Sequence, residues 1–233
     1  MTGQRSSSRA PRIDAMDEIR LLITDDDPMV RIALKHFISR APEIVVVGEA
    51  ENGFEAIEAV ERLNPDIVTM DVQMPGMGGI EATEAITARW PGICILACTT
   101  LDGRDTVLPM LSAGASGYML KDSSPDEIVS ALRQAHQGTS SLSPRIAAML
   151  VKHVRDETTK GPSNGELEAL TERETEVLEH LAQGMSNAEM AKALHVSEGT
   201  IKAHLGGIMA KWQVRDRVQV LVAAARAGLV NFN

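Results

Sequence analysis

Acidic residues follow two short apolar runs, and their positions suggest chemistry on phosphate. Asp25 and Asp26 come directly after the run at residues 21–24, and Asp71 comes directly after the run at residues 67–70. If the two runs are neighbouring parallel strands, their carboxyl ends meet at one sheet edge, where ligands bind in open α/β sheets. Carboxylates this close repel one another unless a cation joins them, and their oxygens suit Mg²⁺. The sequence therefore predicts a magnesium site there.

Two more polar residues end later apolar runs and would complete a phosphoryl-transfer site. A carboxylate nucleophile such as Asp71 gives an aspartyl phosphate. Lys121, after the run at residues 116–120, can neutralise the transferred group, and Thr99, after the run at residues 93–98, can donate a hydrogen bond to it. Each residue alone is more often an ordinary surface or strand-end residue. The joint spacing is what indicates phosphoryl chemistry.

The elements that must position these residues alternate between strand and helix patterns. The five apolar runs, rich in Val, Ile and Leu, suit parallel strands that are covered on both faces. Helical spacing between the runs predicts right-handed βαβ units. We expect a doubly wound, flavodoxin-like sheet of five parallel strands, most simply in the order 2-1-3-4-5. The runs lie at residues 21–24, 44–47, 67–70, 93–98 and 116–120.

Capping residues mark most of the helix starts in this unit. Asp27 is an N-cap followed by a first-turn proline, and Ser124 begins a capping box. The helix after the fourth strand is different. Asp102 can cap it, but Pro109 lies inside it and removes a backbone hydrogen bond at a cost of about 3 kcal/mol. We expect this helix to be short, kinked or mobile.

Residues 167–230 have helical spacing throughout and predict a second, small all-α unit. Thr171 and Ser186 each begin a capping box. A helix from residue 186 to about 194 and a helix from 198 to about 211 are separated only by a tight turn, which is the helix-turn-helix pattern. The preceding residues 144–154 predict one amphipathic helix, and residues 156–165 predict a flexible linker.

These patterns divide the chain into four parts. We expect a disordered tail at residues 1–16, an α/β domain at 17–136, a linker with one amphipathic helix at 137–166 and a helix-turn-helix domain at 167–233. The net charge of −9 is concentrated in the α/β domain, with 20 acidic and 9 basic residues, against 8 and 7 in the last domain. The difference suggests two units with different partners.

Other features favour a cytoplasmic protein. No apolar run approaches the roughly 18 residues of a membrane span, and the first residues lack the apolar core of a secretory signal. Cys94 and Cys98 would point to the same face of one strand. We expect both to be buried free thiols, which is typical of a reducing compartment.

Four segments of the first unit together resemble the receiver domain of bacterial response regulators: LITDDDP at residues 22–28, MDVQMPG at 70–76, TT at 99–100 and GYMLKD at 117–122. By this resemblance Asp71 is the phosphoacceptor, and Thr99 and Lys121 hold the phosphoryl group. The resemblance also implies that Tyr118 is the switch aromatic. It implies that Asp26, Asp71 and the main-chain carbonyl of Gln73 bind Mg²⁺, and that Asp25 assists largely through water. Three mild departures are Thr24, Gly78 and Pro109, of which only Pro109 affects the expected output surface.

Residues 170–178, 184–191 and 196–205 resemble the LuxR-type helix-turn-helix, so the whole chain is similar to the NarL/FixJ class of response regulators. On the exposed face of the expected recognition helix, Lys202 is the only long donor, and Ala203 can touch a thymine methyl. Further candidates for DNA contact are Asn187, Ser197, Thr200, His204 and Lys211. Six bases are predicted to form a basic side turned toward DNA: Lys192, Lys202, Lys211, Arg215, Arg217 and Arg226.

The resemblance implies a transcriptional regulator of a two-component system. A sensor histidine kinase would phosphorylate Asp71 and thereby control homodimerisation, expected through the last helix, and binding to double-stranded DNA. One alternative, an aspartyl-phosphate enzyme, lacks its acid-x-acid motif because Gln73 replaces the second acid. The only catalysis we expect is the domain's own phosphorylation and dephosphorylation. The other alternative, a phosphorylation-independent DNA-binding protein, would normally lack part of the acid, threonine and lysine set, which is complete here.

Overall fold

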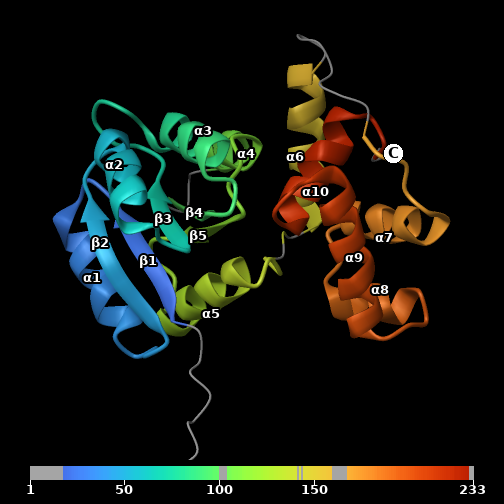
Figure 1. Cartoon of the computed structure of the whole chain (residues 1–233), viewed down its shortest axis with the longest axis horizontal. Coiled ribbons are helices and arrows are strands. Elements are labelled where there is room, and N and C mark those ends of the chain that lie inside the picture. Colours follow the sequence, from blue (N-terminus) through green and yellow to red (C-terminus); the bar gives the residue numbers. More distant parts are fainter. Residues whose placement is uncertain (1–17, 100–103, 141, 143, 159–166, 231–233) are drawn as a thin grey trace, which may run out of the picture.

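The computed structural model describes residues 18–99, 104–140, 142, 144–158 and 167–230, which form an α/β part and a helical part (Figure 1). The α/β part contains one parallel sheet in the order β2-β1-β3-β4-β5, as predicted. Its strands are β1 Ile19–Thr24, β2 Ile44–Ala50, β3 Ile67–Asp71, β4 Cys94–Thr99 and β5 Gly117–Leu120. All residues of β3 and β4 are buried, which explains why their sequences are mostly apolar.

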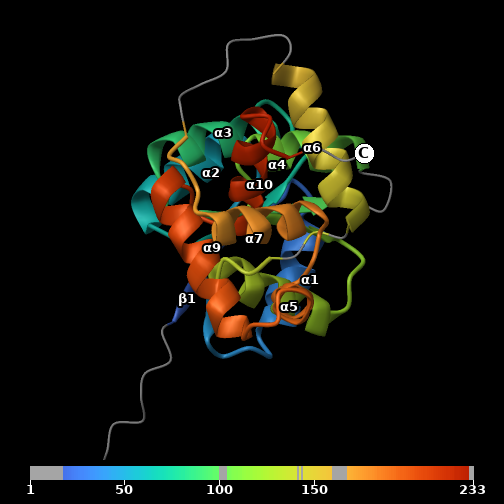
Figure 2. The same cartoon turned by 90° about the vertical axis from the view of Figure 1, so that its right-hand side faces the viewer.

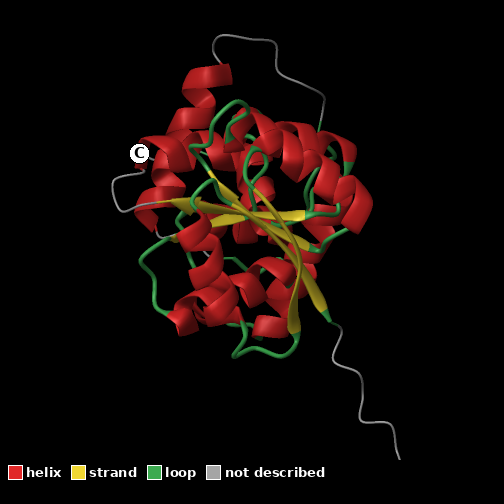
Figure 3. Cartoon of the chain, turned by 90° about the vertical axis from the view of Figure 1, so that its left-hand side faces the viewer, coloured by secondary structure: helices red, strands yellow, loops and turns green. Residues whose placement is uncertain are grey.

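Helices cover both faces of the sheet (Figure 3). On one face lie α1 Pro28–Ile38 and α5 Pro125–His136, and on the other lie α2 Gly53–Leu63, α3 Gly79–Arg89 and α4 Arg104–Ser112. Successive strand residues point to opposite faces, so Leu21 belongs to the α1–α5 core and Leu22 to the other core. Cys94 and Cys98 both lie in the α1–α5 core as buried free thiols, as predicted.

Local signals account for most helix boundaries. The Asp27 side chain accepts a hydrogen bond from the Met29 amide at 2.8 Å, and Ser124 forms a complete capping box with Glu127. The helix α4 is short, with nine residues, and it contains Pro109, in agreement with the prediction. The expected cap at Asp102 lies outside the described residues.

The linker helix α6 spans Pro144–Thr158, so the prediction of a flexible segment from residue 156 is wrong for residues 156–158. The helix is anchored by Ala147, Leu150, Val151 and Val154, which are buried, and it contacts α10 and α4. Once such a helix has formed, each further residue adds a hydrogen bond at little cost. The first helix-breaking residues, Gly161 and Pro162, come only later in the sequence.

The helical part consists of α7 Glu172–Ala182, α8 Asn187–Ala193, α9 Glu198–Trp212 and α10 Arg217–Arg226 (Figure 2). Thr171 and Ser186 form the predicted capping boxes, and a tight turn with His195 in the left-handed region joins α8 to α9. One hydrophobic core runs from the α2–α4 face of the sheet through α6 into α7–α10. Among the described residues, no helix has the length and apolar character needed to cross a bilayer.

Candidate functional site

The three predicted acids meet at the carboxyl edge of the sheet. Strands β1 and β3 pair directly, with Thr24 opposite Met70, so the residues that follow them are neighbours. Carboxylate oxygens of Asp25, Asp26 and Asp71 all lie within 4.8 Å of one another. Asp25 and Asp71 are buried and Asp26 is exposed, which leaves the cluster open on one side.

Lys121 bridges two of these acids. Its Nζ lies 2.7 Å from Oδ2 of Asp25 and 3.1 Å from Oδ1 of Asp71. Burial raises the pKa of Asp71, and the attraction of Lys121 offsets this only in part. Burial alone would lower the pKa of Lys121, but its contacts with Asp25 and Asp71 outweigh that effect and raise it. One ammonium therefore faces three acids, and the site carries an excess of negative charge.

This donor set fits Mg²⁺, because hard oxygen ligands and unbalanced negative charge are what that ion requires. The predicted fourth ligand, the carbonyl of Gln73, belongs to the turn that follows Asp71. This turn folds back closely on the site. A Cβ placed on Gly79 would lie 2.0 Å from the main-chain oxygen of Asp71, so a side chain at position 79 would displace the turn.

The remaining predicted residues of the site lie on β4 and β5. Thr99 ends β4 and is buried, and its carbonyl accepts the amide of Lys121 at 2.8 Å. Tyr118 is half-buried in β5 and packs against the core on the α2–α4 face. Cys98 lies in the same strand as Thr99, and burial raises the pKa of its thiol to about 12. The thiol is therefore protonated at neutral pH and does not compete as a nucleophile.

Arg31 contributes to this region, although the sequence analysis did not identify it. Its side chain is buried, and NH1 donates to the main-chain oxygen of Asp25 at 2.7 Å. The same guanidinium contacts Glu49 at 3.3 Å and Glu51 at 2.5 Å. The available signal was spacing, because Arg31 lies three residues before Leu34 on the buried face of α1.

The candidate DNA contacts lie around the start and the outer face of α9. Lys202 and Ala203 are exposed, and His204 is half-buried. Ser197 caps α9 by accepting the Thr200 amide at 3.1 Å, and the two hydroxyls lie 2.9 Å apart.

Two other candidates already have partners within the domain. Lys211 Nζ lies 2.6 Å from Glu174, and Asn187 accepts a hydrogen bond from Arg217 at 3.2 Å. These contacts hold α9 on α7 and α10 on α8, so each side chain would have to exchange a partner to reach a phosphate.

The prediction of a single basic side is wrong for one of its six members, and two others have partners in the α/β part in this conformation. Arg217 is buried and donates to the carbonyl of Met185 at 2.5 Å, and burial lowers its pKa to about 10. Arg215 and Arg226 instead reach main-chain carbonyls of the α/β part. Helical spacing predicts which residues share a face, but it does not predict which neighbour covers that face.

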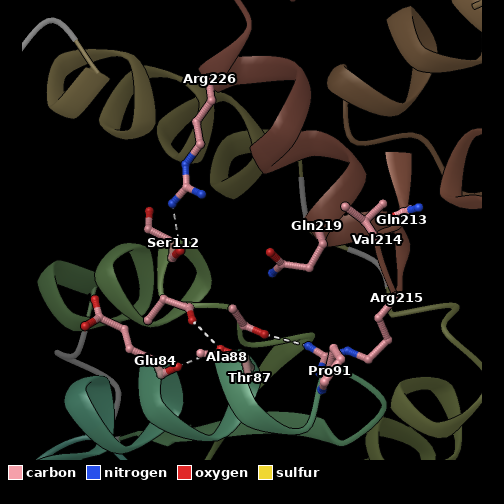
Figure 4. A pocket seen from close by; sticks show the side chains of 12 residues that line it. Glu84, Thr87, Ala88, Pro91, Ser112, Gln213, Val214, Arg215, Gln219 and Arg226 are labelled. Atoms are coloured by element: carbon pink, nitrogen blue, oxygen red, sulfur yellow. Dashed lines mark hydrogen bonds between the residues drawn. The ribbon is translucent and has the colours of Figure 1, made fainter. Parts of the chain in front are cut away.

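Arg215 and Arg226 belong to a contact between the two parts (Figure 4). Gln219 donates to the carbonyls of Leu111 at 3.2 Å and Ala115 at 3.0 Å, at the C-terminal end of α4. Arg226 donates to the carbonyl of Ser112 at 3.1 Å, and Arg215 donates to that of Gly114 at 2.6 Å. Arg215 also reaches the carbonyl of Ile93, at the end of the α3–β4 turn. These side chains surround a cavity of about 370 Å³.

A second cavity of about 370 Å³ lies between α9 and the segment that follows α5. Lys202 and Met209 line it from α9, and Gln137, Gly138 and Thr139 line it from the other side. The end of the α/β part therefore lies beside the expected recognition helix.

Comparisons with known proteins agree with this architecture. Residues 21–133 match the family "Response regulator receiver domain", and residues 168–224 match "Bacterial regulatory proteins, luxR family". The transcriptional regulatory protein LnrK of Bacillus subtilis is 41% identical over 92% of this chain and 100% of its own length. The nitrate/nitrite response regulator protein NarL of Escherichia coli is 35% identical over 87% of this chain and 93% of its own. A solved LuxR-family response regulator from Aurantimonas covers 58% of this chain and 97% of its own, with 38% identity and a TM-score of 0.53.

Proposed function

Because this chain belongs to the two-component response regulators that join a receiver domain to a LuxR-type DNA-binding domain, we propose that phosphorylation of Asp71 is the event that switches its DNA binding. The observation that carries this proposal is the bridge from Lys121 to both Asp25 and Asp71 beside the acid cluster. It places a fixed positive charge where a phosphoryl group would arrive.

The residues of the site have separate roles in this step. An oxygen of Asp71 forms a bond to phosphorus while the bond from phosphorus to the donor, such as a kinase phosphohistidine, breaks. Asp25, Asp26, Asp71 and the carbonyl of Gln73 would hold Mg²⁺, which when bound neutralises charge on the acids and the phosphoryl group. Lys121 exchanges its contact with Asp71 for a phosphoryl oxygen, and the Thr99 hydroxyl donates to another. When Thr99 moves toward the phosphoryl group, Tyr118 would turn inward as the switch residue.

The DNA-binding part supports recognition of a duplex through α9. Lys202 and Ala203 would read base edges, and Ser197, Thr200 and His204 would contact the backbone together with Asn187 and Lys211. The apolar face of α10, which we propose as the surface for homodimerisation, is buried within this conformation against α6, α7, α9 and α4. Phosphorylation would therefore control dimerisation by making this face available.

The rest of the proposal follows from the domain order. We assign the receiver to residues 17–136, the linker to 137–166 and the DNA-binding domain to 167–233. The partners are a sensor histidine kinase, operator DNA and a second copy of the chain, and the place of action is the cytoplasm. The chain acts as a transcription regulator. Its own catalysis is confined to gain and loss of the phosphoryl group.

Intact mass measurement after incubation with Mg²⁺ and acetyl phosphate tests this proposal. We expect one added phosphate on the wild type and none on Asp71→Asn. Phosphate on both proteins would place the acceptor elsewhere, and phosphate on neither would remove the proposed switch. Operator binding and molecular mass in solution, measured with and without the phosphate, then test the link to dimerisation.

A further inference from the structure

Arg31 is the one buried charged side chain of α1, and it contacts the main chain between two of the proposed metal ligands. The carbonyl of Asp25, which accepts from Arg31 NH1 at 2.7 Å, belongs to the peptide unit that joins Asp25 to Asp26. Because a peptide unit is planar, its orientation sets the directions in which both residues leave it. Holding this carbonyl therefore restricts the positions of both carboxylates.

The guanidinium is itself held from a second strand. Glu51 accepts from NH2 of Arg31, and Glu49 accepts from its Nε. Glu49 lies near the end of β2, the neighbour of β1, and Glu51 directly follows β2. The planar guanidinium holds its donors in a rigid fork, whereas the three donors of a lysine ammonium are compact and rotatable and cannot keep this arrangement of acceptors. The contacts of Arg31 thus connect the end of β2 to the turn after β1, where the acids must converge.

We propose that Arg31 is a positioning residue for the metal site, which acts by orienting the Asp25–Asp26 peptide. The inference rests on the proposed function, since it concerns the same magnesium site. This role differs from a purely electrostatic role of the Arg31 charge, and the two roles predict opposite changes in Mg²⁺ affinity when Arg31 is replaced. Loss of a positive charge near the acids would favour Mg²⁺ binding, whereas loss of the peptide contact would weaken it.

The main variant is Arg31→Lys, which keeps the charge and removes the geometry. We expect the dissociation constant for Mg²⁺, measured by isothermal titration calorimetry, to increase about 5- to 30-fold, which corresponds to roughly 1–2 kcal/mol. We also expect saturating Mg²⁺ to restore most of the phosphorylation rate with acetyl phosphate. Arg31→Met should weaken Mg²⁺ binding as well, although it removes a positive charge.

Lys35→Met is the matched control. Lys35 lies on the same helix and pairs with Glu49 at 2.7 Å, but its contact is with β2 and not with the Asp25 peptide. We expect this variant to bind Mg²⁺ as tightly as the wild type or slightly more tightly.

Several outcomes separate the hypotheses. Arg31→Lys with a Mg²⁺ affinity within twofold of the wild type would overturn the inference, and so would tighter binding by Arg31→Met. If Arg31→Lys does not fold, Glu51→Ala removes one exposed anchor of the guanidinium, and an unchanged affinity there would have the same meaning. A wild type that binds no Mg²⁺ would instead contradict the proposed function, and the inference with it.

Discussion

Asp71 lies in an environment that opposes its ionisation in the absence of a metal ion. Burial raises the pKa of its carboxyl despite the nearby Lys121. When the pKa of a carboxyl is higher in the folded state than in the unfolded state, ionisation of that carboxyl destabilises the folded protein. The loss of stability begins near the unfolded pKa, about 4, and is complete above the folded pKa. At pH 7 and without metal, Asp71→Asn should therefore raise the free energy of unfolding.

Urea unfolding of both proteins with and without Mg²⁺ measures this effect. The wild type should gain more stability from Mg²⁺ than Asp71→Asn does, because the ion relieves charge that the variant lacks. Lys121→Met is the opposite control and should lower the stability of the metal-free chain. A metal-free Asp71→Asn protein that is less stable than the wild type would contradict the charge argument.

Glu174 shows the reverse behaviour in the DNA-binding domain. The ion pair with Lys211 and the amide of Thr171 lower its pKa to about 2, from an ordinary value of 4.5. The stabilisation is therefore complete above pH 4.5 and is lost as the pH falls toward 2. We expect Glu174→Gln to cost roughly 1–2 kcal/mol at pH 7 and to flatten the dependence of stability on pH across this window.

Unfolding followed by the fluorescence of Trp212, which is buried in the same domain, can test this prediction. Glu176→Gln is the matched control, since Glu176 is a half-exposed neighbour in an i,i+3 pair with Arg173. Such surface pairs contribute about 0–1 kcal/mol. Equal effects of the two variants would mean that the contact with Lys211 has no special weight.

At the scale of elements, α4 contacts the DNA-binding domain although its sequence contains a residue that disfavours a helix. Pro109 lies inside this nine-residue helix and cannot donate the usual hydrogen bond to the carbonyl four residues earlier. Pro109→Ala should therefore raise the free energy of unfolding by about 1–3 kcal/mol. Pro125→Ala is the control, because Pro125 is in the first turn of α5, where no helical bond is lost. A lower melting temperature for Pro109→Ala would indicate that packing of the proline ring outweighs the missing bond.

The range over which a sequence signal acts explains which elements could be predicted from the sequence. Strand runs and capping boxes act within a few residues, so the strands and the starts of α5, α7 and α8 could be inferred directly. The sheet order followed from the alternation of strands and helices, which is typical of a doubly wound sheet. The end of α6 was predicted too early, because a polar composition at residues 156–158 does not by itself end a helix, and Gly161 and Pro162 come only later.

The acids of the candidate site could be placed because each follows a strand whose neighbours were predicted. Arg31 and Arg217 could not, because burial of a charged side chain depends on carbonyl and carboxylate partners far away in the sequence. For the same reason the predicted basic side of the DNA-binding domain is only partly correct.

At the scale of the whole molecule, the two domains share one hydrophobic core and a set of directional contacts. The C-terminal end of a helix presents unpaired carbonyls and a partial negative charge. The last turn of α4 contains no basic residue of its own, and Gln219, Arg226 and Arg215 supply donors to it and to the turn that follows. A change in the position of α4 would therefore be transmitted directly to α10.

Removing these donors should loosen the domain contact without changing the proposed phosphorylation site at Asp71. Net hydrogen bonds contribute about 0.5–1.5 kcal/mol each, so the combined variant Arg215→Lys and Gln219→Ala should favour the separated form by roughly 1–3 kcal/mol. We expect a larger radius of gyration in small-angle scattering and tighter operator binding by the unphosphorylated protein. Arg226→Ala, which removes one exposed contact, should have a smaller effect. If the combined variant stays as compact as the wild type and binds DNA no better, the shared apolar core, and not the carbonyl contacts, holds the domains together.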